Sequence, residues 1–450
     1  MQGIPLIIAF VIAIALMIFA ISKLKIHPFL SLMAVSLLLA IAAGIPFTEI
    51  ASTIGAGFSG TFTSIGIVII LGALVGVLLE KTGAAIKMSD CVIKLVGKKN
   101  PELAILIMGW IVSIPVFCDS GFVILNPIRK SMVQRTGKSS VSMTIALSLG
   151  LYISHCFIPP TPGPIAAANT LGIGENLLLV MGMGALISIP ALIGSYFFAM
   201  YIGKKVKSKD EIDGSDEIVK SYEELVAEFG KLPSALMSFA PIVVPILLMA
   251  LSSAFNMAGL SVPFVTFLGA PIVALAVGVI LGVILLAMQH LMDGFYELTN
   301  ETLKVVGPIL FVTAAGGVLG KVIATSNLVD FITENSNALE SIGIFFPFLL
   351  AAILKSAQGS STVSLTTTAG ILAPLMGALG LDTPALAALT VMAIGAGAMT
   401  VSHANDSYFW VVTNFGNLKV EDGYKTQTLG TLVVGLCSMV GVFIMYLILK

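Results

Sequence analysis

Charge is scarce in this sequence: Asp, Glu, Lys and Arg make up 10% of its 450 residues, whereas 57% are hydrophobic. Mean hydropathy is +1.04. Apolar runs of about 20 residues recur, each long enough to cross a hydrocarbon core of about 30 Å. These values exclude an ordinary soluble domain and predict an all-α protein that crosses a lipid bilayer several times. The net charge of -1 offers no basic excess for nucleic acid, so we expect no nucleic-acid partner.

Motifs for catalysis, cofactors and metals are also missing. The four cysteines are scattered and form no CxxC pair, and the chain holds no HExxH motif. It also lacks the GxxxxGKS or GxxxxGKT loop that cradles nucleotide phosphates, which argues against pumping driven by ATP. We therefore expect no enzyme activity, no cofactor and no metal.

Basic residues cluster between the apolar runs, and the positive-inside rule predicts that these segments are cytoplasmic. They are 23–25, 81–99, 129–138, 204–231, 304 and 419–425. Other segments contain no Lys or Arg and are predicted to be external, namely 46–57, 173–176, 255–262, 326–341 and 380–384. The run 4–22 has neither a basic region before it nor a small-residue cleavage site. We expect it to be a retained transmembrane helix with an external N-terminus.

Two halves of the chain repeat one another weakly. FTEIAST at 47 resembles FYELTNE at 295, GALVGVLLEKTG at 72 resembles GGVLGKVIATSN at 316, NPI at 126 resembles APL at 373, and the SH pair at 154 recurs at 402. The four matches keep the same order and nearly the same offset. They predict a first repeat over 1–202 and a second over 234–450. A charged cytoplasmic linker, partly helical around 217–230, joins them over 203–233.

Each half is predicted to hold five transmembrane helices and one re-entrant hairpin. An odd number of crossings inverts the second half, as in secondary transporters whose site lies at the midplane between broken helices. The first half is predicted as spans 4–22, 28–45, 61–80 and 177–202, a hairpin 102–128 broken at 118–121, and a broken span 139–172. The second half is predicted as spans 234–255, 263–289, 304–324 and 428–449, a hairpin 342–376, and a broken span 384–415.

Ionisable side chains at membrane depth are costly, so each one is a functional hypothesis. Asp119 lies at the first hairpin tip and Lys355 lies near the second. His155 lies in the first helix break, SHCFIPPTPGP, whereas His403 and Asp406 lie in the second, SHANDS. Lys355 is expected to add fixed positive charge for an anion, or to pair with Asp119 when the site is empty.

Both hairpin tips have the composition of an anion site. The second reads KSAQGSSTVSLTTT over 355–368, and a helix starting at Ser360 would point free amides into a cavity. DSG at 119–121 offers the same arrangement from the opposite side. The alternative is a Ser/Thr-rich packing face. The residues predicted to bind substrate are Asp119, Ser120, Gly121, Ser154, His155, Thr161, Gly163, Gln358, Gly359, Ser360, Ser361, Thr362, His403 and Asn405.

Four residues are candidates for coupling transport to a proton: Asp119, His155, His403 and Asp406. Histidine titrates near neutral pH, and burial favours the neutral form of a carboxylate. The structural alternatives are an interhelical hydrogen bond for each histidine and a helix cap for Asp406. Na⁺ would also suit exposed carbonyl and hydroxyl oxygens, so a sodium-coupled carboxylate transporter remains an alternative.

At these residues the chain resembles the gluconate permease family over nearly its full length. The motifs that carry the resemblance are KIHPFL (25–30), GAGFSGT (55–61), GFVILNPI (121–128), SHCFIPPTPGPIA (154–166), GSSTVSLTTTAGILAPL (359–375) and SHANDSYFW (402–410). The resemblance implies proton-coupled import of gluconate or another small acid, such as glycerate or D-serine, across the bacterial inner membrane. It also implies a homodimer within a wider superfamily of elevator-type anion transporters.

The chain departs from the gluconate pattern at three positions. Many members have glutamate where Asp119 stands and a second histidine where Thr161 stands, and some have arginine at the position of Lys355. These departures leave the substrate open within the class of small carboxylates. We predict a symporter that imports such a carboxylate, with a channel and a membrane enzyme as further alternatives.

Overall fold

The computed structural model describes residues 4–96, 100–209, 211, 232–257, 260, 262–326, 343–403 and 406–450. Within these ranges the regular secondary structure is helical and contains no strand. Six of the described helices are long and apolar enough to cross a membrane, or seven if the bent pair Ile67–Lys81 and Ala84–Cys91 is one span. The prediction of an all-α protein with several helices long and apolar enough to cross a membrane is confirmed.

The first half contains two helix pairs that are interrupted inside the protein. The hairpin is formed by α6 (Pro101–Val112) and α7 (Cys118–Thr136), and the broken span by α8 (Ser140–Phe157) and α9 (Pro162–Thr170). The other helices are α1 (Ile4–Ser22), α2 (Pro28–Ala43), α3 (Phe47–Thr61), α4 (Ile67–Lys81), α5 (Ala84–Val96) and α10 (Leu177–Ile202), with a π-helical turn over Phe62–Gly66 between α3 and α4.

The second half has interruptions at corresponding places. Its hairpin is formed by α19 (Phe345–Gln358) and α20 (Ser361–Leu372), and its broken span by α21 (Pro384–Met399) and α22 (Ser407–Phe415). The other helices are α13 (Ala235–Met257), α14 (Pro263–Gly269), α15 (Pro271–Met288), α16 (Phe295–Thr325), α23 (Val420–Gly423) and α24 (Leu429–Leu449). The linker 212–231 and its predicted helix lie outside the described residues.

Two helix starts differ from the prediction. The segment 47–57, predicted as an external loop, is already helical, because α3 begins at Phe47. Likewise α16 begins at Phe295 and not near 304. The added stretch FTEIASTIGAG is rich in polar residues and glycine, and FYELTNETL is rich in polar residues. A search for apolar runs does not detect a helix of that composition, even when it continues directly into a span.

The break of the first hairpin was also predicted in the wrong place. The helices stop over residues 113–117, which include Pro115, and α7 begins at Cys118. Proline lacks the amide that would continue α6, so this segment and not CDSG interrupts the hairpin. As a result, Asp119 lies in the first turn of α7.

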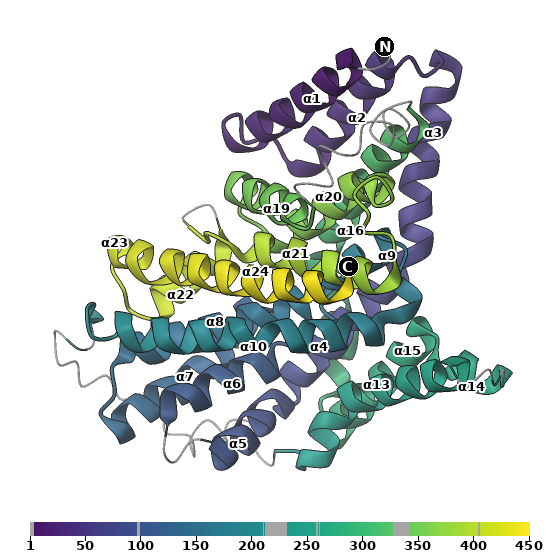
Figure 1. Cartoon of the computed structure of the whole chain (residues 1–450). Helices are drawn as coiled ribbons and strands as arrows, with labels where there is room; N and C mark the ends of the chain where they lie inside the picture. Colours follow the sequence, from purple (N-terminus) through teal and green to yellow (C-terminus); the bar gives the residue numbers. More distant parts are fainter. Residues whose placement is uncertain are drawn as a thin grey trace.

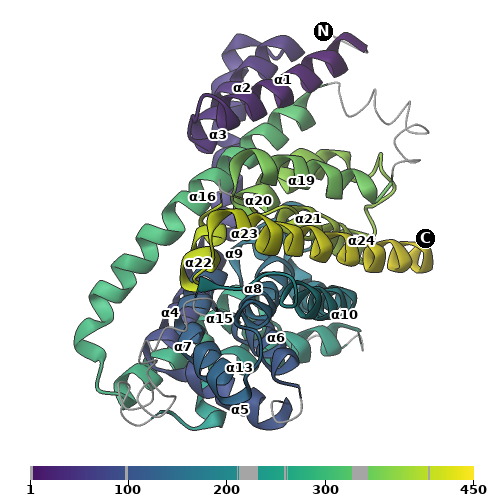
Figure 2. The same cartoon turned by 90° about the vertical axis from the view of Figure 1, so that its left-hand side faces the viewer.

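The helix breaks lie where elements of both halves meet (Figures 1 and 2). Helices α1 and α2 lie at one end of the molecule, and α13, α14 and α15 at the opposite end. The long helices α3–α4 and α16 run between these ends, with α16 packed on α2, α3 and α4, and α15 packed on α4. The hairpins, the broken helices, α10 and α24 occupy the middle, and α10 packs on α24.

Segments predicted to be cytoplasmic converge around one buried arginine. Arg129 is fully buried, and its guanidinium donates to Asn126 Oδ1 at 2.8 Å, to Ser140 Oγ at 2.8 Å and to the Phe415 carbonyl at 3.4 Å. The Ser140 amide in turn donates to Glu211 Oε1 at 2.9 Å. These bonds join α7, the start of α8, the end of α22 and the chain that follows α10.

Close packing of α6 on α8 depends on glycine. A Cβ atom at Gly150 of α8 would overlap the Leu106 carbonyl of α6, and one at Gly109 would lie 2.8 Å from the Leu147 oxygen. Gly182 of α10 is a matched contrast, because nothing lies within 4 Å of a Cβ atom built there.

Gly150→Ala should therefore lower the stability of the protein by about 1–3 kcal/mol, because α6 and α8 must move apart. Gly182→Ala should leave stability unchanged or raise it by about 0.5–1 kcal/mol, as expected for removing glycine from a helix interior. Thermal unfolding of both variants in the same detergent measures the difference. Equal melting temperatures would contradict this packing.

Candidate functional site

The second hairpin reverses direction at Gly359. This residue has a left-handed backbone with φ of 87°, which side chains with a Cβ atom rarely adopt. Ser360 then caps α20, accepting a hydrogen bond from the Val363 amide at 3.3 Å. The first amides of a helix have no partner within it, so the positive end of the α20 dipole lies at this tip. Ser361 and Thr362 form the first turn and are buried.

A buried ion pair lies directly beside this tip. Lys355 is in the last turn of α19 and is fully buried, and its Nζ lies 2.5 Å from Asp406 Oδ2. Nζ also donates to the Gly359 carbonyl. Charges at such depth are tolerated only when they are paired, because water does not hydrate them. The pair fixes the hairpin tip to the break between α21 and α22, and Lys355 is bonded to Asp406 and not to Asp119.

Asp406 also caps the helix that follows it. Its Oδ1 accepts from the Tyr408 amide at 3.1 Å, and its Oδ2 accepts from Ser402 Oγ at 2.5 Å. Val401, in the same break, has φ of 60°, which is unfavourable for a β-branched residue. Surrounding contacts must hold such a conformation, and strain of this kind clusters at functional sites. The carboxylate of Asp406 is thus both a helix cap and a partner of Lys355.

Asp119 approaches the same cluster from the first half. Its Oδ1 accepts from Ser407 Oγ at 3.4 Å, and Ser407 is the first residue of α22. Its carboxylate lies within electrostatic range of Asp406 and Lys355. The start of α7 therefore meets the start of α22, and the cluster contains one ammonium and two carboxylates.

Two buried polar atoms on α8 face this cluster. The Tyr152 ring centroid lies 5.7 Å from Lys355 Nζ, and His155 lies within electrostatic range of Lys355 and Asp406. Among the described residues, His155 Nδ1 has no hydrogen-bond partner, and the Tyr152 hydroxyl has none at hydrogen-bond distance but interacts with the Ser361 side chain. Buried polar groups are normally satisfied, so these two atoms are available to a ligand or to water.

His403 lies at the edge of the cluster. Its Nε2 is 3.3 Å from Ser356 Oγ on α19, so the second break and the second hairpin meet here as well. Gln358 is the last residue of α19, and Asn405 lies outside the described residues. The structure therefore brings Asp119, His155, Lys355, His403 and Asp406 to one region.

Other residues predicted to bind substrate make internal contacts. The Thr161 hydroxyl donates to the carbonyls of Ile158 and His155, at 2.8 and 2.9 Å, and so satisfies the end of α8. The Ser154 hydroxyl donates to its own helix.

Three further predicted residues lie at helix contacts. A Cβ atom at Gly121 or Gly163 would lie 2.7 Å from a leucine of a neighbouring helix, so both glycines allow close packing. The Ser120 hydroxyl interacts with Glu80 of α4.

The cluster also contains residues that were not predicted to bind substrate, namely Tyr152, Ser356, Ser402 and Ser407. Tyr152 precedes His155 by three residues and therefore shares its helix face, a signal that was present in the sequence. Ser402 and Ser407 are the first and last residues of the SHANDS break, and no helical spacing in the sequence relates them to His403 or Asp406. Among the described residues, no three His, Cys, Asp or Glu side chains are grouped closely enough to hold a metal ion.

Comparison with known proteins identifies relatives along the whole chain. The model of the GntP family permease matches residues 4–448. An uncharacterized permease of Haemophilus influenzae is 34% identical over 425 residues, which cover 92% of this chain and 86% of that protein. The inner membrane permease YgbN of Escherichia coli is 31% identical, with 97% of each chain covered. A gluconate permease of Zymomonas mobilis is 28% identical, with 98% of each chain covered.

Solved transporter structures share the fold. Neisseria gonorrhoeae MtrF, from a class described as antimetabolite efflux pumps, has a TM-score of 0.66 at 14% identity, with 94% of this chain and 96% of that chain covered. The Alcanivorax borkumensis YdaH transporter has a TM-score of 0.65 at 16% identity, with 94% and 99% covered. The match to the permease family shows that the protein is a transporter and not an enzyme. The chain belongs to the GntP permease family.

Proposed function

We propose that this permease imports gluconate or a closely related sugar acid across the bacterial inner membrane together with a proton. The observation that carries the proposal is the buried Lys355 ammonium beside the N-terminus of α20, since these two positive groups suit a carboxylate. Relatives support the class of substrate: one is described as a gluconate permease, and an L-idonate transporter of Escherichia coli is 27% identical. The Escherichia coli inner membrane permease supports the location.

In the proposed mechanism the substrate carboxylate exchanges with Asp406 as the partner of Lys355. Without substrate, the charges of Lys355 and Asp406 cancel across their 2.5 Å contact. An entering carboxylate adds a negative charge where water does not hydrate it, and that charge is costly. A proton on Asp406 removes one negative charge, so Lys355 and the substrate then cancel. Substrate and proton therefore enter the site together.

The remaining polar groups would orient the substrate hydroxyls. Among the described residues His155 Nδ1 has no partner, and the Tyr152 hydroxyl lies beside the Ser361 side chain, so both could bind a substrate hydroxyl. Ser361 and Thr362 would add first-turn amides and hydroxyls from α20. Asp119 contacts Ser407 and His403 contacts Ser356 in the same cluster. We keep Asp119, His155 and His403 as further candidate proton carriers, although Asp406 is favoured because it contacts Lys355 directly.

We also propose that the two halves, 1–202 and 234–450, are inverted repeats joined by the linker 203–233. Helix packing supports this proposal. The second arm of the first hairpin, α7, packs on the second arm of the second broken span, α22. Likewise, the second arm of the second hairpin, α20, packs on the second arm of the first broken span, α9. An exchange of this kind is expected when a site is built at the interface between two repeats.

The proposed orientation places the N-terminus outside the cell. Its support is the convergence of the basic segments after α7 and α10 with the end of α22 around Arg129. Such an excess of Lys and Arg is typical of the cytoplasmic side. A homodimer remains a prediction from the resemblance to the family.

Two alternatives concern the transported species. Na⁺ could replace the proton if serine oxygens and the exposed carbonyls of the breaks bound it. Glycerate or D-serine could replace the sugar acid. The ammonium of D-serine would need an anionic partner, and Asp119 lies close enough to the cluster to provide one.

A thermal-shift screen of the purified permease tests the substrate class. Gluconate, L-idonate, glycerate, D-serine and a dicarboxylate should be compared at one pH, with gluconic acid methyl ester as the control that lacks a carboxylate. We expect stabilisation by gluconate or L-idonate and none by the ester, because only an anion pairs with Lys355. Stabilisation by the dicarboxylate alone would overturn the proposed substrate class.

Removing one partner of the buried pair should be more harmful than removing both. Lys355→Gln and Asp406→Asn should each destabilise the protein by on the order of 3–5 kcal/mol, because an unpaired charge stays buried. The double variant should recover much of that loss but should not transport. The control is Lys425→Gln, whose ion pair with Asp422 is solvent-exposed and should matter by about 1 kcal/mol or less. If the double variant lost as much stability as the two single variants lose together, the two charges would not be coupled.

The coupling ion is tested in proteoliposomes without Na⁺. An inward proton gradient should drive accumulation of radiolabelled gluconate, and an uncoupler should abolish it. Asp406→Asn should keep gluconate exchange between the two sides, because it mimics the protonated carboxyl group, but should not respond to the gradient. Accumulation that requires Na⁺ at constant pH would favour the alternative.

A further inference from the structure

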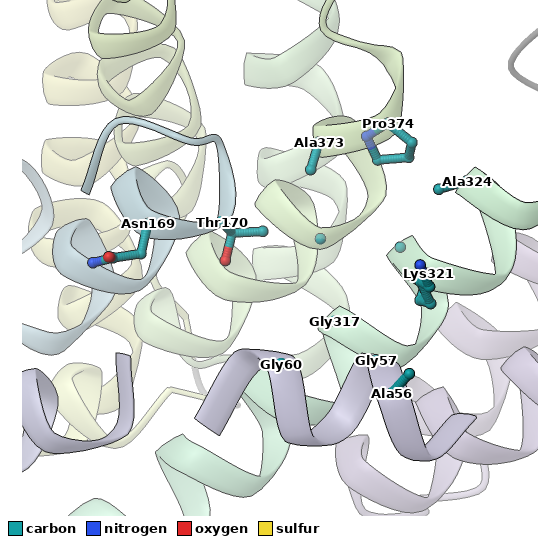
Figure 3. A pocket seen from close by; sticks show the side chains of 12 residues that line it. Ala56, Gly57, Gly60, Asn169, Thr170, Gly317, Lys321, Ala324, Ala373 and Pro374 are labelled. Carbon is teal, nitrogen blue, oxygen red and sulfur yellow. The ribbon is translucent and has the colours of Figure 1, made fainter. Parts of the chain in front are cut away.

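A cavity lies away from the Lys355 cluster, at the opposite end of α20. It has a volume of about 330 Å³ and is bounded by α3, α9, α16 and the end of α20 (Figure 3). Most of its walls are glycine and alanine. Pockets of a few hundred Å³ hold small ligands, and this one has room for a six-carbon sugar acid.

One cation dominates this cavity. Among the described residues that line it, Lys321 alone is charged. None of the ion pairs in the described part of the chain includes Lys321. Figure 3 shows Thr170 of α9 across the cavity from Lys321, whereas the Asn169 amide points away from Lys321 and donates to the Ile165 carbonyl at 2.9 Å. Within the described part of the chain this ammonium has no fixed counter-charge, and with the Thr170 hydroxyl opposite it has the chemistry that a hydroxylated anion requires.

The glycines explain why the cavity has backbone walls. A Cβ atom at Gly320 of α16 would lie 2.5 Å from the Gly370 carbonyl of α20, and one at Gly57 of α3 would lie 2.9 Å from the Gly317 carbonyl of α16. The three helices therefore approach closely, and no bulky side chain fills the space beside Lys321.

The cavity lies on the side from which an imported substrate would arrive. Residues 173–176, which follow α9, and 380–384, which follow α20, contain no Lys or Arg and are predicted to be external. Helix α20 has 12 residues, so its two ends are separated by about 18 Å. One end reaches this cavity, and the other lies at the Lys355 cluster.

We propose that this cavity is a second anion-binding site, in which Lys321 captures a small carboxylate before it reaches Lys355. The inference rests on the proposed function, since it assigns the same substrate class to an external site. Lys321 raises the local concentration of the anion and so increases its rate of entry. The competing interpretation is that Lys321 only extends to the membrane surface from the end of α16.

Lys321→Gln tests the proposal through initial rates of gluconate uptake. The KM should rise roughly tenfold with little change in kcat, since capture is weakened and translocation is not. Raising the ionic strength should increase the KM of the unmodified protein and have less effect on the variant. Lys321→Arg should stay close to the unmodified protein. The control is Lys304→Gln on the same helix, outside the cavity lining, which should change nothing.

A chemical test gives a readout besides transport. In Lys321→Cys, an impermeant methanethiosulfonate that carries an ammonium should restore the KM, and one that carries a sulfonate should raise it further. Gluconate should slow both modifications if it occupies the cavity. Unchanged KM in Lys321→Gln together with no protection by gluconate would overturn the inference and leave the proposed function intact. Absence of uptake of both gluconate and L-idonate by the unmodified protein would instead refute the proposed function.

Discussion

The ion pair between Lys355 and Asp406 is the interaction on which the rest of the site depends. Both groups are buried, and they lie 2.5 Å apart. Neither charge is tolerable there without the other, because the surroundings replace almost none of the lost hydration. Each member also stabilises its own helix end, since Lys355 binds the carbonyl of the residue that turns the hairpin and Asp406 caps α22. One ion pair thus holds two interrupted helices in register.

The same property makes the pair suitable for transport. A buried ammonium that pairs with one carboxylate can exchange it for another carboxylate at little cost. A change in the net charge of the buried site, in contrast, is costly. In the proposed mechanism, exchange of Asp406 for a substrate carboxylate is therefore tied to protonation, and the coupling would follow from electrostatics. The hydroxyl of Tyr152 and the His155 nitrogen, which has no partner among the described residues, would then select for hydroxylated acids. Lys321 would act earlier and less specifically, as an exposed cation in a wider cavity.

The sequence predicted features that depend on apolar runs, proline and glycine. It located α20 after Gly359 to within a residue, and it singled out each ionisable residue of the cluster. It placed the first hairpin break at CDSG because polar residues suggested a tip, whereas Pro115 ends α6 earlier. The early starts of α3 and α16 were missed because their first turns are polar. The partner of Lys355 was beyond sequence reasoning, because residues 355 and 406 lie on different elements and only packing brings them together. The contacts between these residues and the substrate remain a prediction.

In the proposed mechanism an anion binds only when Asp406 takes up a proton, and calorimetry measures this linkage directly. Gluconate should be titrated into the detergent-solubilised permease at one pH in buffers with different ionisation enthalpies, so that the heat reports protons exchanged with the buffer. We predict uptake of about one proton per bound gluconate, and none in Asp406→Asn, because binding and protonation are linked. Binding without proton uptake, or equal uptake in Asp406→Asn, would contradict the mechanism.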